Sequence, residues 1–382
     1  MAGFEAQPLE RPASRADRRV AIADTTIRDE HLLGADPRLL ADRDLSEVWR
    51  SCALGVEQRI AVGRQLAALG VDVIEAGFVE QPGGTSTAAA LAAEFAEEGP
   101  VVSAQIGAFA GEAALGAATE AVSKARRPRV HVHVSTADLV DEHGQFRRHP
   151  ALLLDQAMGA IAALRAAVED IEFSPPRTDL GAVGIAAAWT RAAIDAGVRT
   201  INLRYCTDGP EPDEFLALLA ELRRLAAPPA GVVLSADIFA PDLSTEDAYV
   251  ASTACAEAAL AAGCGQVKCA FHGIAGTPGH AALEMVAFQL WLRRRLEESH
   301  LSTGIDTTRL LEASRVIAET KGVDLPPSQP LLGEDFTSPS LADFPTDPTE
   351  RILTAAAVRI VLEGLGVSVP PWLDEFANPS TL

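Results

Sequence analysis

The stretch AALGVDVIEAGF (67–78) recurs in pattern twice more in the chain, as AAIDAGVRTINL (192–203) and ALAAGCGQVKCAF (259–271). Each begins as an alanine-rich helix end, reaches a glycine, and continues as a short strand. A glycine at that point suits the left-handed backbone conformation that ends many helices. The pattern therefore predicts the joint between a helix and the next strand of a repeating β/α fold.

Five further stretches have the same strand character, which brings the number of predicted strands to eight. They are RVAIADT (19–25), PVVSAQIGAF (100–109), RVHVHVST (129–136), EDIEFS (169–174) and GVVLSADIF (231–239). Eight strands that alternate with helices are typical of a (β/α)8 TIM barrel, whereas a doubly wound sheet usually has five or six. A dinucleotide-binding sheet also needs a glycine-rich turn after its first strand. Here that strand runs into DTTIRDEH (24–31), so we predict an α/β protein of the TIM-barrel class.

The organisation outside the barrel follows from changes in composition. We expect the barrel domain at 19–300, after a flexible N-terminus at 1–18. Residues 301–382 are expected to form a small C-terminal helical subdomain, with helices at 306–321 and 351–366 around a proline-rich linker. The apolar face of the last helix needs a partner, and such arms commonly pack on a second subunit. A homodimer is therefore expected.

The composition excludes several classes of partner. A hydrophobic content of 48% is enough for a large core, and a net charge of −21 repels nucleic acids and anionic lipid surfaces. No stretch approaches the roughly 20 apolar residues that span a bilayer, and the N-terminal residues lack the apolar core of a signal peptide. The five cysteines form no CxxC pair. We therefore expect a cytoplasmic protein that acts on small molecules.

Active sites of TIM barrels lie at the C-terminal ends of the strands. The first strand is followed by a cluster of charged residues that includes Arg28, Asp29, Glu30 and His31. A cation can polarise a carbonyl group, and carboxylates can hold a divalent metal. The alternative is a surface cluster of salt bridges.

Polar residues on later strands are further candidates. His131 and His133 are spaced to share one face of a strand, which suits metal binding, although His133 is better interpreted as a core histidine bonded to its neighbours. Glu75 and Asn202 are expected to point into the barrel, where a buried polar group needs a partner or a ligand. Either could instead serve a packing network.

The loop after the eighth strand, KCAFHGIAGTPGHAALEMV (268–286), is rich in glycine and leads into a helix. Glycines before a helix N-terminus can form a site for a carboxylate or a phosphate. His272 and His280 could be metal ligands or acid–base groups, because imidazole titrates near neutral pH. They could also be exposed loop residues without a function.

These motifs, in this order over most of residues 19–340, resemble the superfamily of isopropylmalate synthase, homocitrate synthase and hydroxymethylglutaryl-CoA lyase. The motifs that show this resemblance include DTTIRDEH, IEFSPPRTD, RTINL and HGIAGTPGHAALEMV. The resemblance implies a TIM barrel that binds a divalent metal and makes or breaks a carbon–carbon bond between an acyl-CoA and a 2-oxo acid. The segment QPLLGEDFTSPSLAD, after the barrel, also resembles the synthases. The sequence leaves no space for the leucine-sensing regulatory domain that isopropylmalate synthases have, so we expect that domain to be absent.

The resemblance implies roles for individual residues. Arg28 matches the arginine that polarises the oxo acid, and Asp29 matches the neighbouring metal ligand. His280 stands where the family has an asparagine beside the metal. The positions that line the family's substrate pocket are Glu75, His131, Thr136 and Asn202, and Tyr205 is expected near them.

The sequence differs from the family at the positions of the metal ligands. The histidine pair of strand seven is absent from LSADIFAPDL (234–243), where Asp237 is the remaining ligand, and Gly276 replaces a family glutamate. Either the ligands have moved to the loop after strand eight, or the metal is lost and the reaction has changed. For the first case we expect manganese, magnesium or zinc on Asp29, Asp237 and His280, with His272 as the alternative to His280.

The expected function is an acyltransferase that condenses an acyl-CoA, with acetyl-CoA as the simplest donor, with a small 2-oxo acid. Arg28 would stabilise the developing alkoxide. His31, His272 and Tyr205 are the candidates for the base that forms the enolate. The alternatives are a lyase or aldolase that cleaves a hydroxy acid with or without a metal, and a non-catalytic paralogue that binds a ligand.

Overall fold

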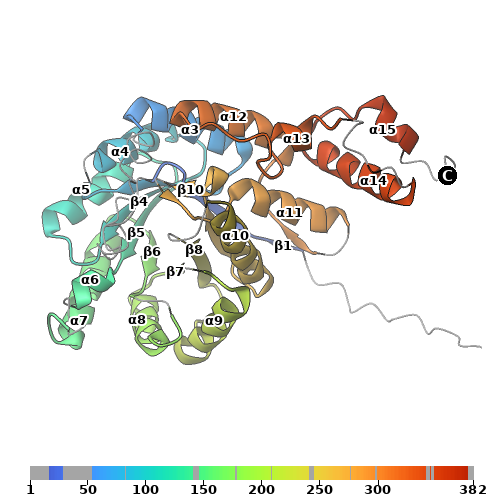
Figure 1. Ribbon diagram of the computed structural model, residues 1–382. Helices are drawn as coiled ribbons and strands as arrows, with labels where there is room; N and C mark the ends of the chain where they lie inside the picture. The colour runs from blue at the N-terminus through green and yellow to red at the C-terminus, as the bar shows by residue number, and fades with distance from the viewer. Residues whose placement is uncertain are drawn as a thin grey trace, which may run out of the picture.

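The computed structural model describes residues 17–28, 54–81, 83–140, 146–176, 179–207, 209–240, 245–275, 277–296, 299–340, 345 and 348–376. Eight parallel strands form a closed barrel in which each strand pairs with the next along the chain and the last pairs with the first. Helices surround the barrel (Figure 1). The predicted (β/α)8 TIM barrel is thereby confirmed.

Each barrel strand overlaps one of the eight stretches predicted to be a strand. The barrel strands are β2 (Ala21–Asp24), β3 (Val73–Phe78), β4 (Val101–Gly107), β5 (Pro128–His133), β6 (Asp170–Ser174), β7 (Thr200–Cys206), β8 (Val233–Phe239) and β9 (Gln266–Cys269). The helices up to the end of the barrel are α3 (Val56–Leu69), α4 (Gly84–Glu94), α5 (Glu112–Val122), α6 (Thr136–Leu139), α7 (Pro150–Arg165), α8 (Val183–Asp195), α9 (Pro212–Ala226), α10 (Thr245–Ala261) and α11 (Leu283–Arg295). Among the described residues, no helix is both long and apolar enough to cross a bilayer.

Glycines at the three repeated joints have the predicted left-handed conformation. Gly70, Gly197 and Gly263 have φ angles of 97°, 95° and 103°. At Gly70 a side chain would also collide with the backbone, because a Cβ atom would lie 2.2 Å from the carbonyl oxygen of Gly304. Glycine therefore ends each helix without strain and lets the chain turn directly into the next strand.

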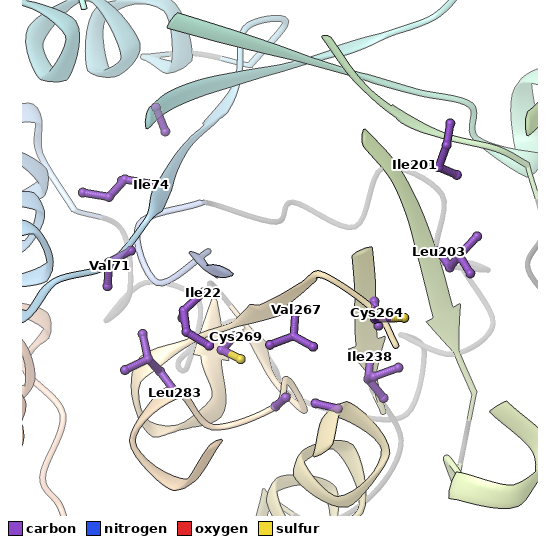
Figure 2. Close-up of a cluster of buried hydrophobic side chains, with 14 of the residues drawn as sticks. Ile22, Val71, Ile74, Ile201, Leu203, Ile238, Cys264, Val267, Cys269 and Leu283 are labelled. Carbon is purple, nitrogen blue, oxygen red and sulfur yellow. The ribbon is translucent and has the colours of Figure 1, made fainter. Parts of the chain in front are cut away.

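The outward faces of the strands form the hydrophobic core with the helices. Figure 2 shows part of this layer, including Ile22, Ile74, Ile201 and Val267 from four different strands. Side chains alternate between the two faces of a strand, so every second residue of these strands points to the helices. Full burial of each such aliphatic side chain contributes about 1.5–3 kcal/mol to stability.

The inward faces of the strands are polar. Buried charged and polar side chains alternate there with the outward apolar ones, and they include Glu75, Arg129, His131, Glu172, Asn202, Asp237 and Lys268. Branched apolar residues usually fill a TIM barrel. Because polar groups are costly to bury unless they are paired, their partners determine what this interior can do.

The first part of the chain after the barrel is attached to it at two places. The short strand β12 (Leu301–Ser302) pairs with β1 (Arg18–Arg19), and α12 (Leu310–Lys321) packs against α3. Beyond it, α13 (Glu334–Thr337), α14 (Pro348–Gly364) and α15 (Pro371–Phe376) extend to one side of the molecule (Figure 1). The helices predicted at 306–321 and 351–366 thus correspond to α12 and α14, while the division of the chain at residue 300 stays a prediction.

Candidate active site

A hydrogen-bonded turn after β2 carries Arg28 to the mouth of the barrel. The Asp24 carboxylate accepts hydrogen bonds from the backbone N–H and the hydroxyl of Thr26, both at 2.8 Å. The hydroxyl oxygen of Thr26 accepts a further bond from the N–H of Phe271, and the N–H of Arg28 donates to the carbonyl oxygen of Thr25. Asp24 therefore supports the turn, and burial raises the pKa of its carboxyl group to about 7.

Arg28 is fully buried between two carboxylates. Its Nη1 atom lies 2.5 Å from Oε2 of Glu75 and 3.5 Å from Oδ2 of Asp237, and the side chain is 0% exposed. A guanidinium group with partners on two different strands has a fixed direction. The predicted inward orientation of Glu75 is confirmed by this contact.

A chain of alternating charges continues from Arg28 across the barrel. Lys268 Nζ lies 2.6 Å from Oε1 of Glu75 and 2.8 Å from Oε1 of Glu172. The guanidinium of Arg129 then lies 2.9 Å from Glu172 and 2.9 Å from Asp170. We call this set the ion-pair chain; its members are Arg28, Glu75, Lys268, Glu172, Arg129 and Asp170.

The ion-pair chain keeps its buried carboxyl groups ionised. Burial alone would raise the pKa of Glu75, but the charges of Lys268 and Arg28 outweigh that effect and hold the pKa well below its usual range. The same balance, with burial opposed mainly by Lys268, lowers the pKa of Glu172 to about 2. Both side chains are therefore carboxylates at neutral pH.

His131 and Asn202 meet at a serine on the strand between them. His131 Nε2 lies 2.8 Å from Oγ of Ser174, and Nδ2 of Asn202 donates to the same oxygen at 2.9 Å. His131 Nδ1 lies 2.6 Å from Oε1 of Glu75, so the histidine links this group to the ion-pair chain. The inward orientation predicted for Asn202 is confirmed.

Several buried oxygen atoms of the barrel strands have no hydrogen-bond partner among the described residues. They include Oδ1 of Asn202 and Oδ1 of Asp237. A buried acceptor without a donor costs about 1–3 kcal/mol. A hydrogen-bond donor or a cation bound beside these oxygens would remove that cost, so this part of the barrel is a candidate binding site.

Other predicted residues lie away from this group. His133 is half-buried, and its Nδ1 atom lies 3.0 Å from the carbonyl oxygen of Ile106, as expected for a core histidine. Tyr205 belongs to the outer hydrophobic layer, where its ring packs on Phe215 of α9. Tyr205 alternates with inward positions of β7, which is why it faces the helices.

His272 is held by the C-terminal part of the chain. Its Nε2 atom lies 2.7 Å from Oγ of Ser314 on α12, and its backbone N–H donates to Glu284. It has a φ angle of 58°, in the left-handed region, and burial lowers the pKa of its imidazole to about 3. Among the described residues, no hydrogen bond or ion pair joins it to the ion-pair chain.

His280 lies above the end of β8. Its ring stacks on Phe239 with 4.5 Å between ring centroids, and Phe239 follows Asp237 on the same face of the strand. His280 and Asp237 are therefore on one side of the mouth. Asp29 and His31 lie outside the described residues, as does the side chain of Thr136.

The centre of the ion-pair chain was not predicted from the sequence. Lys268, Glu172 and Arg129 were not among the predicted site residues. A signal was present, because Lys268 in QVKC (266–269) and Glu172 in DIEFS (170–174) each stand between apolar residues of a strand. Period-two alternation places such residues on the face opposite the hydrophobic one.

Two sets of side chains have the chemistry to hold a divalent cation. Glu75, His131 and Glu172 offer ligand atoms within 4.8 Å of one another, and the Lys268 ammonium lies among them. In the predicted set at the mouth, Asp237 has an unsatisfied oxygen and His280 lies on the same side. Its third member, Asp29, is outside the described residues.

Comparisons with known proteins agree with the architecture. The family model HMGL-like matches residues 49–317. The 2-isopropylmalate synthases of Synechococcus sp. (strain WH7803) and of Pyrococcus furiosus are each 30% identical to the chain, over 82% and 83% of its length. The alignments cover 56% and 58% of those proteins, so the chain spans little more than half the length of these relatives.

Solved structures share the fold at low sequence identity. A hydroxymethylglutaryl-CoA lyase from Pseudomonas aeruginosa superposes with a TM-score of 0.57 at 18% identity, covering 81% of this chain and 94% of that protein. An HMG-CoA lyase from Brucella melitensis gives a TM-score of 0.56 at 16% identity, covering 80% and 99%. The family model covers well over half of the sequence, and the chain therefore belongs to the HMGL-like family.

Proposed function

We propose that this chain is an acyltransferase that forms a carbon–carbon bond between an acyl-CoA and a small 2-oxo acid. The observation that carries the proposal is the buried guanidinium of Arg28, fixed between Glu75 and Asp237 beyond the end of β2. This is the end of the barrel at which TIM-barrel enzymes have their active sites. The relatives named 2-isopropylmalate synthase support the same class of reaction.

The proposed reaction begins with removal of a proton from the acyl group, for which acetyl-CoA is the simplest donor. The resulting enolate carbon attacks the ketone carbon of the oxo acid, and the ketone oxygen becomes an alkoxide. Arg28 stabilises this developing charge with a donor that is already oriented before the reaction. Protonation of the alkoxide and hydrolysis of the thioester then release free CoA.

Among the candidates for the base, we propose His31. His272 is bonded to Ser314, and Tyr205 packs on Phe215 outside the barrel. His31 belongs to the sequence that directly follows Arg28. We further propose that Glu75, His131, Thr136 and Asn202 border the substrate, with the free Oδ1 of Asn202 available to accept a hydrogen bond from a hydroxyl group.

We propose that Asp29, Asp237 and His280 would hold a divalent cation at the mouth. Manganese, magnesium and zinc all accept such a set of oxygen and imidazole ligands. When bound, the cation would supply Lewis acidity toward the ketone oxygen of the oxo acid. The unsatisfied Oδ1 atom of Asp237 supports this assignment.

The alternative is the reverse reaction, in which a hydroxy acid derivative is cleaved by a lyase or aldolase. It would use the same alkoxide, and hence the same Arg28. Both directions can be assayed with purified protein. Acetyl-CoA and a panel of 2-oxo acids test condensation through the appearance of free CoA thiol, and hydroxyacyl-CoA esters test cleavage through the appearance of acetyl-CoA. Thiol release that requires an oxo acid supports the proposal, and cleavage without condensation supports the alternative. If the protein shows neither activity, that result favours a non-catalytic ligand-binding protein.

We also propose that the chain forms a homodimer through its C-terminal helices. Leu353 on α14 is 66% exposed, and the apolar cluster between α14 and α15 is small. A second subunit would cover this face. Light scattering should give the mass of a dimer for the wild type and of a monomer for Leu353→Asp, whereas a monomeric wild type would exclude the proposal.

A further inference from the structure

The ion-pair chain contains a cluster with the donor atoms of a metal site. Glu75, His131 and Glu172 are all buried, and one ligand atom from each lies within 4.8 Å of the other two. Two carboxylate oxygens and an imidazole nitrogen form a donor set that zinc, cobalt and manganese accept. The charge of this cluster needs a positive partner, because two buried carboxylates otherwise repel each other.

A side chain of the protein occupies the position that a cation would need. Lys268 Nζ lies 2.6 Å from Glu75, 2.8 Å from Glu172 and 3.1 Å from Nδ1 of His131. The ammonium group thus contacts each of the three potential ligands. The Lys268 side chain is only 1% exposed, so water does not replace these contacts.

Neither carboxylate of the cluster lacks a positive partner. Glu75 lies between Lys268 and Arg28, and Glu172 lies between Lys268 and Arg129. A divalent cation bound to these carboxylates would be forced against the Lys268 ammonium in a low-dielectric interior, where repulsion between like charges is strong. The cluster can therefore hold the ammonium or a metal, but not both.

We infer that Lys268 is the resident cation of the Glu75–His131–Glu172 cluster and excludes a divalent metal from it. The ammonium neutralises the two carboxylates and fixes them from inside the barrel, as a metal would in a site with these ligands. A metal that this chain binds must then use other residues. The inference concerns occupancy of the cluster and does not depend on which reaction the protein catalyses.

Lys268→Ala provides the direct test. It removes the ammonium, leaves space, and leaves two buried carboxylates with one less cation. Cobalt(II) is a suitable probe because its visible absorption reports coordination by the protein. We expect Lys268→Ala to bind about one additional cobalt ion per chain. The dissociation constant for this ion should be at least about tenfold lower than that of any His131-dependent cobalt binding by the wild type. The double variant Lys268→Ala/His131→Gln should lose that ion, and Lys124→Ala, which removes an exposed lysine, should behave as the wild type.

Two results would overturn the inference. One is a folded Lys268→Ala protein that gains no His131-dependent cobalt. The other is a wild-type protein whose cobalt binding already falls in His131→Gln. The second comparison needs no change at Lys268, so it decides the question even if Lys268→Ala does not fold: equal cobalt binding by the wild type and His131→Gln supports the inference.

Discussion

Arg28 and Glu75 form a buried ion pair, with 2.5 Å between Nη1 and Oε2, at the mouth of the barrel. The other carboxylate oxygen of Glu75 lies 2.6 Å from both Lys268 and His131. Because both oxygens of Glu75 are held, the carboxylate cannot rotate. The guanidinium of Arg28 is therefore oriented before any substrate binds, which is the condition for effective stabilisation of a developing charge.

We predict that Arg28→Lys lowers kcat/KM for CoA release by at least about 100-fold, the usual effect of losing an oriented donor at a developing oxyanion. A lysine keeps the charge but cannot reach two carboxylates and a substrate oxygen with one planar group. Circular dichroism should show an unchanged fold. Arg126→Lys, at an exposed position, is the matched control. Kinetics close to those of the wild type would remove Arg28 from the mechanism.

We predict that the two loop histidines differ in their effect on bound metal. His280→Ala and Asp29→Ala should each reduce metal content and activity together, whereas His272→Ala should leave the metal content unchanged because His272 is bonded to Ser314. Elemental analysis of each purified protein measures this. Binding should also weaken as the pH falls, since a ligating imidazole must be neutral. Full metal content in His280→Ala would refute the mouth site.

Glu284 should make stability depend on pH. Burial raises the pKa of its carboxyl group from 4.5 to about 7, although Tyr249 and the N–H of His272 donate hydrogen bonds to it. A carboxyl group with a raised pKa in the folded state stabilises the fold fully below about pH 4.5, and this contribution is lost as the pH rises through 7.

In Glu284→Gln the side chain is neutral at every pH. The free energy of unfolding of this variant, relative to that of the wild type, should therefore increase between about pH 5 and about pH 8. The expected increase is up to about 3 kcal/mol, at 1.4 kcal/mol per pKa unit. Any hydrogen bond lost in the variant cancels in this comparison, because it is lost at both pH values. Urea denaturation of the wild type, Glu284→Gln and the exposed control Glu120→Gln measures the difference. A constant difference at the two pH values would show that Glu284 does not titrate in this range.

The segment after the barrel should be required for solubility. Truncation after residue 300 removes α12 and the partner strand of β1, together with the buried side chains of Leu301, Ile305, Leu310, Ala313 and Ile317. Full burial of a leucine or isoleucine side chain contributes about 1.5–3 kcal/mol, and the truncation removes this contribution. We predict an insoluble or monomeric product. Truncation after residue 340, which retains α12, is the control and should stay soluble. A soluble, fully active protein of residues 1–300 would show that the segment is dispensable.

The barrel and the alternation of residues along its strands could be predicted from the sequence, although Tyr205 was expected near the pocket and faces the helices. The glycines at the helix ends, such as Gly70, and the alternation of apolar and polar residues act over a few neighbouring positions, so they can be read without the fold. The same local logic correctly placed Glu75 and Asn202 inside the barrel. The spacing of His131 and His133 predicted that they share one face of a strand, but it could not predict their different hydrogen-bond partners.

Which charges meet depends on the closure of the barrel and could not be predicted from the sequence. Lys268 and Glu75 are 193 positions apart in the chain and lie 2.6 Å apart in the barrel, because closure brings β9 and β3 to either side of β2. His272 and Ser314 likewise meet because α12 packs back onto the barrel. Pairing energies of buried charges depend on distances and on the exclusion of water, and both are set by the closed barrel rather than by local sequence.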